Sequence, residues 1–264
     1  MKNNMPIAFL FVCLMFINFG FVQNINAKAN SLSLHTFITS TSVDTTKQEL
    51  VANPTFGIDI SHHNNNIVNL LSLKGDSISF VICKATEGVT YTDPHFFDNW
   101  SMTKEKGLIR GAYHFYRTND DPINQAQLFC AIISDRDSTD LPPVIDFENG
   151  SVVDSDSISS IQSNLIIFIN EIEQRMKVKP IIYTSPNCAN KYLNNAFFSQ
   201  YSLWIADYSS VDTPRIPNIW SSKPFLIWQR TDDYSFDNYT LDADLYNGSL
   251  KELRAFINSS VLSN

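Results

Sequence analysis

Short apolar runs that each end in polar residues recur eight times between residues 54 and 258 of this 264-residue chain, and this repetition constrains the fold more than any other feature. The runs are FGIDIS (56–61), FVICKATEG (80–88), LIRGAYHF (108–115), PPVIDFEN (142–149), KPIIYTS (179–185), YSLWIADY (201–208), FLIWQR (225–230) and LDADLYNG (241–248). Stretches with helical periodicity separate several of them, at 96–107, 124–133 and 156–177. Strands that alternate with helices predict parallel βα units.

Eight strands within about 200 residues predict an α/β fold, namely a single compact (β/α) barrel of mainly parallel strands with fewer or shortened late helices. An open, doubly wound sheet is the alternative. In both architectures the carboxyl ends of the parallel strands meet at one edge, and functional sites form there. The polar residues that end each run fall at this edge, so we expect the site to be built from them.

The N-terminal segment differs from the rest of the chain. In residues 1–27 a single Lys2 precedes a long apolar run, and small residues follow at Ala27 and Ala29, which is typical of a secretory signal peptide. An uncleaved membrane anchor is the alternative, because residues 6–22 are near the lower length limit for a span. Residues 28–53 are rich in Ser and Thr and are predicted to be a flexible leader. We therefore expect one domain at 54–258, a short tail at 259–264, and an exported product, secreted or held in the periplasm or cell envelope, with no stable membrane anchor after cleavage.

Charge and cysteine content narrow the partners. The formal net charge of −8 argues against nucleic acid, whose binding depends on Lys and Arg that neutralise phosphates. Cys83, Cys130 and Cys188 lie beyond the signal segment, and their spacings match no metal motif. One disulfide is possible, but a disulfide scaffold is not. We expect a monomer.

The stretch PPVIDFENG at 142–150 places two carboxylates at the end of an apolar run. In a strand, residues i and i+2 point to the same side, so Asp146 and Glu148 would project together. A strand-end cap and a solvated acid are the structural alternative for these two residues. The other interpretation is an acid pair that performs chemistry.

The remaining strand ends supply further ionisable, amide and aromatic groups. They are Asp59, Glu87, His114, Tyr183, Trp204, Asp207, Tyr208, Gln229, Asp242 and Asp244. A barrel would bring them around one opening, where each carboxylate raises the pKa of its neighbours. A carboxyl that stays protonated near neutral pH is what a general acid requires, and aromatic and amide groups suit sugar rings. The tyrosines and Trp204 can equally be core residues, and Glu87 can equally close a local turn.

Glycoside hydrolysis uses a carboxyl pair at the glycosidic oxygen, and some families let the substrate's own acetamido group attack instead. The D-x-E spacing fits this last scheme best. Glu148 would then protonate the leaving oxygen, while Asp146 polarises the acetamido group. Two metal readings are weaker: adjacent His62 and His63 point in opposite directions on an extended chain, and no glycine-rich loop with further ligands follows Asp242 and Asp244.

The ordered set of motifs resembles glycoside hydrolase family 25, the N-acetylmuramidases or lysozymes. The matching stretches are GIDISHH, KATEG with TDPHF and NW, KGLIRGAYHFYR, QAQLF, LPPVIDFEN, IIYTS, LWIADY, IWQ and LDADLYNG, which cover about 55–250. The resemblance implies a compact (β/α) catalytic barrel that cleaves the β-1,4 bond between N-acetylmuramic acid and N-acetylglucosamine in bacterial peptidoglycan, with no metal or cofactor. It also implies that Glu148 is the catalytic acid, that Asp146 is its partner, and that Asp59 and Asp242 are the flanking catalytic acids.

The resemblance has departures and leaves other functions open. Arg230 follows IWQ where an aromatic residue is common, Asp244 stands where Asn is common, and Leu70 or Leu71 replaces an expected Trp. The expected sugar contacts are Glu87, His114, Tyr183, Trp204, Asp207, Tyr208 and Gln229. A glycan-binding module without activity on the same barrel is one alternative function. A hydrolase of chitin-like N-acetylglucosamine chains is the other.

Overall fold

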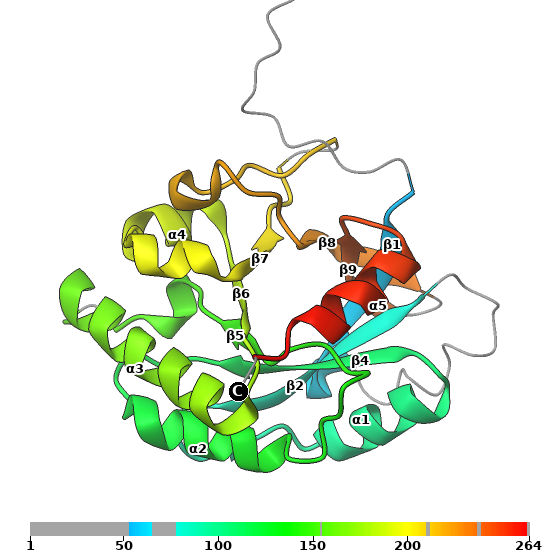
Figure 1. Cartoon of the computed structure of the whole chain (residues 1–264), viewed down its shortest axis with the longest axis horizontal. Coiled ribbons are helices and arrows are strands. Elements are labelled where there is room, and N and C mark those ends of the chain that lie inside the picture. The colour runs from blue at the N-terminus through cyan, green and yellow to red at the C-terminus, as the bar shows by residue number, and fades with distance from the viewer. Residues whose placement is uncertain (1–52, 65–77, 154, 210–211, 237–238, 263–264) are drawn as a thin grey trace, which may run out of the picture. The chain divides into compact units, whose positions relative to one another are not determined.

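The computed structural model describes residues 53–64, 78–153, 155–209, 212–236 and 239–262 (Figure 1). The expected signal peptide, the leader up to residue 52 and the replaced Trp at 70 or 71 lie outside these residues. In the described part of the chain, β1 (Thr55–Ile60) pairs with β2 (Phe80–Glu87) on one side and with β9 (Tyr239–Tyr246) on the other. This double pairing closes the sheet into a barrel, so the open doubly wound alternative is wrong.

Six further strands complete the molecule's single sheet over the described chain. They are β3 (Tyr91–Thr92), β4 (Ile109–Phe115), β5 (Val144–Asp146), β6 (Ile181–Thr184), β7 (Ser202–Ala206) and β8 (Ile227–Phe236). The order around the barrel is β1, β2, β4, β5, β6, β7, β8 and β9, and β3 pairs only with β2. In the barrel, β1, β2 and β4 to β8 run parallel, whereas β9 is antiparallel to both β8 and β1. The short β3 is antiparallel to β2. The compact, mainly parallel barrel is confirmed.

The helices of the described chain agree with the helical periodicity of the sequence. The helices are α1 (Phe96–Glu105), α2 (Pro122–Ile132), α3 (Ile158–Met176), α4 (Pro186–Tyr192) and α5 (Leu250–Ser259), with 3-10 turns η1 (His62–Asn64), η3 (Asn149–Ser151), η4 (Ala196–Gln200) and η5 (Asn218–Trp220). The side chains of Asp121 and Ser157 cap α2 and α3 by accepting hydrogen bonds from the backbone. The predicted helices at 96–107, 124–133 and 156–177 are present, and α4 is shortened as expected.

Strand alternation separates the core into two layers. Side chains that point outward from the barrel pack against α1, α2 and α3, which lie along one side of it (Figure 1). Side chains that point inward, such as Phe80, Ile82 and Val144, fill the barrel floor, and Leu253 and Ile257 of α5 belong to this inner layer. The apolar filling stops before the carboxyl ends of the parallel strands. We call that open end the barrel mouth.

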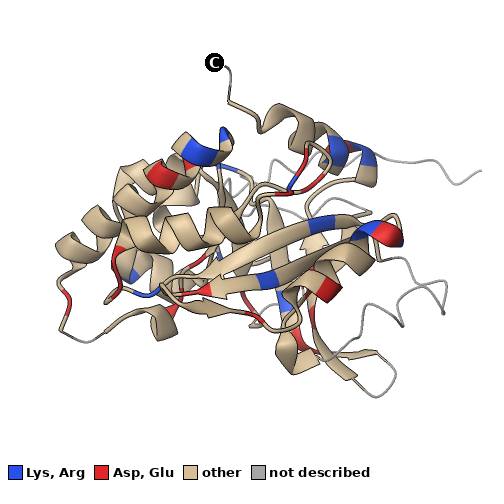
Figure 2. Cartoon of the chain, turned by 90° about the horizontal axis from the view of Figure 1, so that it is seen from below, with Lys and Arg blue, Asp and Glu red and all other residues tan. Residues whose placement is uncertain are grey.

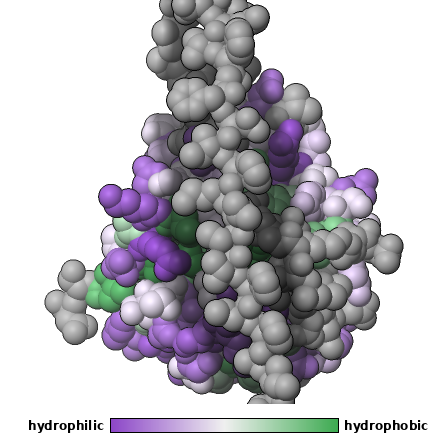
Figure 3. Space-filling model, turned by 90° about the vertical axis from the view of Figure 1, so that its right-hand side faces the viewer, coloured by the Kyte–Doolittle hydropathy of each residue, from purple (hydrophilic) through white to green (hydrophobic). Residues whose placement is uncertain are grey.

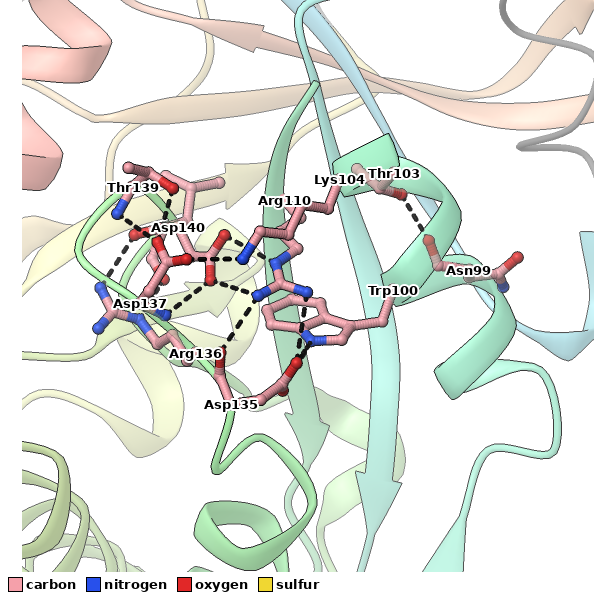
Figure 4. Close-up of polar contacts among 11 residues, drawn as sticks. Asn99, Trp100, Thr103, Lys104, Arg110, Asp135, Arg136, Asp137, Thr139 and Asp140 are labelled. Carbon is pink, nitrogen blue, oxygen red and sulfur yellow. Dashed lines mark hydrogen bonds and ion pairs between the residues drawn. The ribbon is translucent and has the colours of Figure 1, made fainter. Parts of the chain in front are cut away.

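A buried ion pair joins three elements on the outer side of the barrel (Figure 4). Arg110 of β4 donates from Nε and Nη2 to the two carboxylate oxygens of Asp140, at 2.8 and 2.9 Å, and both side chains are almost inaccessible to solvent. The guanidinium carbon lies 3.8 Å from the ring centroid of Trp100 of α1. Trp100 Nε1 in turn donates to Asp135 at 2.8 Å. We call Trp100, Arg110, Asp135 and Asp140 the Arg110 cluster; it ties α1, β4 and the loop before β5 together.

The surface of the described chain combines residues of both charges and both hydrophilic and hydrophobic areas. Basic residues are scattered among acidic ones (Figure 2), and one face shows hydrophilic residues around smaller hydrophobic areas (Figure 3). No described helix combines the length and the apolar character that a bilayer span requires.

Candidate active site

The inward-pointing residues at the barrel mouth surround a small central cavity of about 70 Å³. It is lined by Asp59, Tyr113, Asp146, Glu148, Tyr183, Trp204, Gln229 and Asp242. These residues come from β1, β4, β5 and the turn after it, β6, β7, β8 and β9. Seven of the eight are residues that the sequence predicted for the site, and segments nearly 190 positions apart in the chain meet here. The four expected catalytic acids therefore share one cavity.

Asp146 and Glu148 form the acid pair at this cavity. Asp146 is the last residue of β5 and is buried, and its side chain is hydrogen-bonded to that of Glu148. Glu148 begins the turn into η3, where its backbone N–H donates to Ser151 Oγ at 3.0 Å. Burial and the neighbouring Glu148 carboxylate raise the pKa of Asp146 well above its usual range, and burial also raises the pKa of Glu148. The two carboxyls therefore titrate as a coupled unit that holds a proton to higher pH than two separate carboxyls would.

A second acidic group faces the pair across the cavity. Asp59 and Asp242 are register partners on β1 and β9, and Asp244 lies one inward position further along β9. Gln229 Nε2 donates to Asp59 Oδ2 at 2.6 Å and to Asp242 Oδ2 at 3.3 Å, while Trp204 Nε1 donates to Asp244 Oδ1 at 2.9 Å. Asp244 Oδ2 is buried without a hydrogen-bond donor. Three carboxyls thus share two neutral donor groups, which cannot stabilise three anions.

The pKa values in this second group reflect that shortage. Burial, followed by repulsion from Asp244 and Asp242, raises the pKa of Asp59 well above its usual range. Burial raises the pKa of Asp242 to about 6 and that of Asp244 well above its usual range. Tyr183 donates its hydroxyl to Gln229 Oε1 at 2.7 Å and thereby orients the amide. The barrel mouth is therefore an assembly of carboxyls that keep their protons to higher pH than free carboxyls do.

Asp242 and Asp244 reach the mouth by a different route than the sequence indicated. They were expected at the exit of an eighth parallel strand, but β9 is antiparallel and enters the barrel from the mouth. Both acids lie inside the strand, at positions 242 and 244 of 239–246. Residues i and i+2 of a strand share one face whichever way the strand runs. The sequence therefore identified Asp242 and Asp244 as site residues without revealing the direction of β9.

Substitution of Asp242 is expected to stabilise the fold in a pH-dependent way. The unfolded carboxyl has a pKa near 3.8 and the folded one about 6, so the folded state binds the extra proton between these values. Stability therefore falls as pH rises from about 4 to about 6. Asp242→Asn mimics the protonated form and should raise the free energy of unfolding at pH 7 by on the order of 2 kcal/mol, with no gain below pH ~4. Urea unfolding at the two pH values measures this. Equal gains at both pH values, or a similar pH-dependent gain in the exposed control Asp233→Asn, would contradict it.

His114 does not belong to the cavity. It points outward from β4 and is completely buried, with Nδ1 2.7 Å from Thr86 Oγ1 and Nε2 3.1 Å from Gln125 Oε1. Burial lowers its pKa to about 4, so it is a neutral core residue. The inward position next to it is Tyr113, which lines the cavity. The sequence analysis expected His114 at the site, but Tyr113 takes that place. Residues of β4 alternate between the two faces of the sheet, so Tyr113 shares the inward face with Gly111 and His114 does not; this alternation could have identified Tyr113.

Glu87 lies in a neighbouring pocket of about 620 Å³ instead of the central cavity. This Glu87 pocket is lined by His62, His63, Lys84, Glu87, Gly88, Val89, Thr90, Tyr91, Arg117, Asn119, Asp120 and Val153. Glu87 accepts from Lys84 Nζ at 2.6 Å and from Arg117 Nε at 3.0 Å. Although burial works in the opposite direction, these hydrogen bonds lower the pKa of Glu87. Lys84 and Arg117, which the sequence analysis missed, also favour the ionised form of Glu148.

Asp207 and Tyr208 lie in a second neighbouring pocket, of about 370 Å³. This Arg215 pocket is lined by Glu148, Asn149, Tyr183, Ser185, Pro186, Asn187, Ala206, Asp207, Tyr208, Ser209 and Arg215. Tyr208 is half exposed, and its hydroxyl donates to Gln229 Oε1. Asp207 is buried and paired with Arg215. Glu148 and Tyr183 line both this pocket and the central cavity, so the two spaces adjoin.

The metal and disulfide possibilities find no support in the described residues. No cluster of three or more His, Cys, Asp or Glu side chains with metal-binding geometry occurs among them. His62 Nδ1 lies 2.7 Å from Asp93 Oδ2, which accounts for one of the two adjacent histidines. Cys83, Cys130 and Cys188 are buried free thiols, so the possible disulfide is absent from the structure.

Comparison with known proteins agrees with this geometry. The family model of glycosyl hydrolases family 25 matches residues 58–239. The chain belongs to this family. Family 25 enzymes are glycosidases, and the chain is therefore a glycosidase. Among curated relatives, Lysozyme M1 of Streptomyces globisporus is 31% identical over 77% of this chain and 71% of its own length.

Solved family 25 structures resemble the chain over its whole barrel. A family GH25 lysozyme from Aspergillus fumigatus aligns with a TM-score of 0.68 and 34% identity, covering 78% of this chain and 99% of that one. The bacterial lysozyme from Streptomyces coelicolor aligns with a TM-score of 0.69 and 26% identity, covering 80% of this chain and all of that one.

Proposed function

We propose that this family 25 glycosidase is an exported peptidoglycan hydrolase that cleaves the β-1,4 bond between N-acetylmuramic acid and N-acetylglucosamine. Lysozyme M1 and the two lysozyme structures support this substrate class by similarity. The signal-like segment at 1–27 supports export. One observation carries the proposal: Asp146 lines the small central cavity, and Glu148 lines both this cavity and the adjoining Arg215 pocket.

The size of the central cavity supports a division of labour within the acid pair. A volume of about 70 Å³ is far below the ~300 Å³ at the lower end of small-ligand sites, so the cavity suits a substituent such as an acetamido group better than a whole sugar ring. Asp146 lines this cavity and would orient the acetamido group as it attacks the anomeric carbon. Glu148 lines the cavity and the pocket beyond it, so it would hand its proton to the glycosidic oxygen between them.

The surrounding groups would maintain that chemistry. Burial raises the pKa of both members of the acid pair, which favours a proton on the pair over two adjacent anions. Asp59 and Asp242, whose pKa values are raised by burial and which are held by Gln229, would offer hydrogen bonds to the substituent in the cavity. Tyr183, Trp204 and Tyr113 would enclose it and exclude water.

Product analysis tests the proposal directly. Purified peptidoglycan treated with the enzyme should release fragments that carry N-acetylmuramic acid at the new reducing end, identified by mass spectrometry after borohydride reduction. A non-catalytic binding module would release no new reducing ends, and a cut on the other side of muramic acid would place N-acetylglucosamine there. Faster turnover of N-acetylglucosamine oligomers than of peptidoglycan would support the chitin-like alternative.

A further inference from the structure

The position of Glu148 indicates which part of the substrate occupies each of the two spaces that it lines. A general acid contacts the oxygen that joins the cleaved sugar to its leaving group. With the acetamido substituent of the cleaved sugar in the central cavity, the leaving side of the strand must occupy the Arg215 pocket, because Glu148 lines both spaces. This assignment rests on the proposed function. The pocket's volume of about 370 Å³ is within the range of small-ligand sites, about 300–1,000 Å³.

A cation is held rigidly at this pocket. Arg215 donates to the buried Asp207 carboxylate from Nε at 3.1 Å, from Nη2 at 2.8 Å and from its backbone N–H at 2.7 Å. Ser209 Oγ also donates to Asp207 at 2.7 Å. Although burial works in the opposite direction, these hydrogen bonds lower the pKa of Asp207 to about 2, so it remains an anion in the working range of pH. Both carboxylate oxygens of Asp207 therefore already accept hydrogen bonds, and Asp207 holds Arg215 in its orientation.

The anchored guanidinium keeps donors available for a ligand. The contacts with Asp207 use the Nε and Nη2 edge, and among the described residues no hydrogen bond involves Nη1. The side chain of Arg215 is 57% exposed while that of Asp207 is 1% exposed. Arg215 is also the one basic residue among the side chains that line this pocket. Guanidinium groups that are fixed at one edge recognise carboxylates well, since little side-chain entropy is lost on binding.

Peptidoglycan and chitin-like chains differ in the group that such a cation would recognise. Both carry acetamido groups, but only muramic acid carries a lactyl substituent, which ends in a carboxylate or in a stem peptide with carboxylates. The sugar that leaves directly is N-acetylglucosamine, and the next sugar on the leaving side is muramic acid. We propose that Arg215 is a specificity-determining residue that pairs with a carboxylate carried by this muramyl unit. The enzyme would thereby favour peptidoglycan over neutral N-acetylglucosamine polymers.

A cycle of two enzymes and two substrates tests this pairing. The substrates are soluble peptidoglycan strands in native form and the same strands with carboxylates converted to methylamides by carbodiimide coupling. The enzymes are the wild type and Arg215→Gln. We expect kcat/KM of the wild type to fall about tenfold on the neutral strands, and Arg215→Gln to lose about tenfold on native strands, which matches a charge-assisted pair of ordinary strength. On neutral strands the variant and the wild type should be equal.

The outcomes separate the possible explanations. A variant that loses equally on both substrates would assign Arg215 a structural role through Asp207 and would overturn the pairing, as would a variant that loses on neither. Arg215→Lys, which retains the charge, should keep part of the preference for native strands and allows the test if Arg215→Gln does not fold. Arg254→Gln, at an exposed position on α5, is the matched control and should behave as the wild type. If the wild type releases no reducing ends from native strands, the proposed function fails instead.

Discussion

Glu148→Gln is expected to lower kcat on peptidoglycan by about 10²–10⁴-fold. Glutamine keeps the shape of the side chain and its position beside Asp146, but it cannot transfer a proton to the leaving oxygen. The melting temperature should be unchanged or slightly raised, because the substitution removes a carboxyl whose pKa burial raises. Release of reducing ends measures activity, and calorimetry measures the melting temperature.

The matched control for this substitution is Glu105→Gln, at an exposed position on α1, which should retain full activity. Full activity in Glu148→Gln would show that another group donates the proton. Loss of activity together with a large drop in melting temperature would point to a folding defect, in which case Asp146→Asn would have to be compared under the same conditions.

Asp140→Ala is expected to lower the free energy of unfolding by about 3 kcal/mol, because it removes the buried charge partner of Arg110 and leaves only the exposed Asp135 carboxylate, 3.5 Å from Arg110 Nη1. Asp140 accepts two hydrogen bonds from Arg110 and one from the backbone N–H of Asp137 at 2.9 Å. Its loss removes the contacts that tie β4 to the loop before β5, as seen in Figure 4. Urea unfolding followed by fluorescence gives the measurement.

An exposed ion pair beside the Arg110 cluster provides the control. Lys104 Nζ pairs with Asp137 Oδ2 at 2.7 Å, and both side chains are roughly half exposed. Lys104→Met should therefore change the free energy of unfolding by less than about 1 kcal/mol. If Asp140→Ala cost no more than this control, the buried pair would contribute little, and the packing of Trp100 would have to hold these elements together.

The sequence allowed the barrel and most of its mouth to be predicted, because both depend on local patterns. Each run contains much of a strand, although β8 continues past its run to Phe236, and seven of the eight cavity residues follow from the ends of the runs. His114 shows the limit of this reasoning. The end of a strand can be read to within a residue or two, but the face that a residue occupies changes at every step, so an error of one position replaces Tyr113 with a core histidine.

The features that could not be predicted depend on contacts between distant segments. Arg215 lies in an irregular stretch after β7, and only its pairing with Asp207 marks it as part of a pocket. Lys84 and Arg117 come together through Glu87, from β2 and from the turn after β4. The direction of β9 depends on how β8 turns back, and the pattern of alternating residues is the same in both directions.

The pairing of β1 with β9 also determines when the active centre can exist. The backbone N–H of Thr55 donates to the carbonyl of Gly248 at 2.9 Å, so the two ends of the domain are stitched together. Asp59 is contributed by the first strand and Asp242 by the last, and both depend on this seam for their positions. During translation, almost the entire domain must therefore be synthesised before these carboxyls can come together. A nascent or truncated chain that lacks β9 is expected to have no activity.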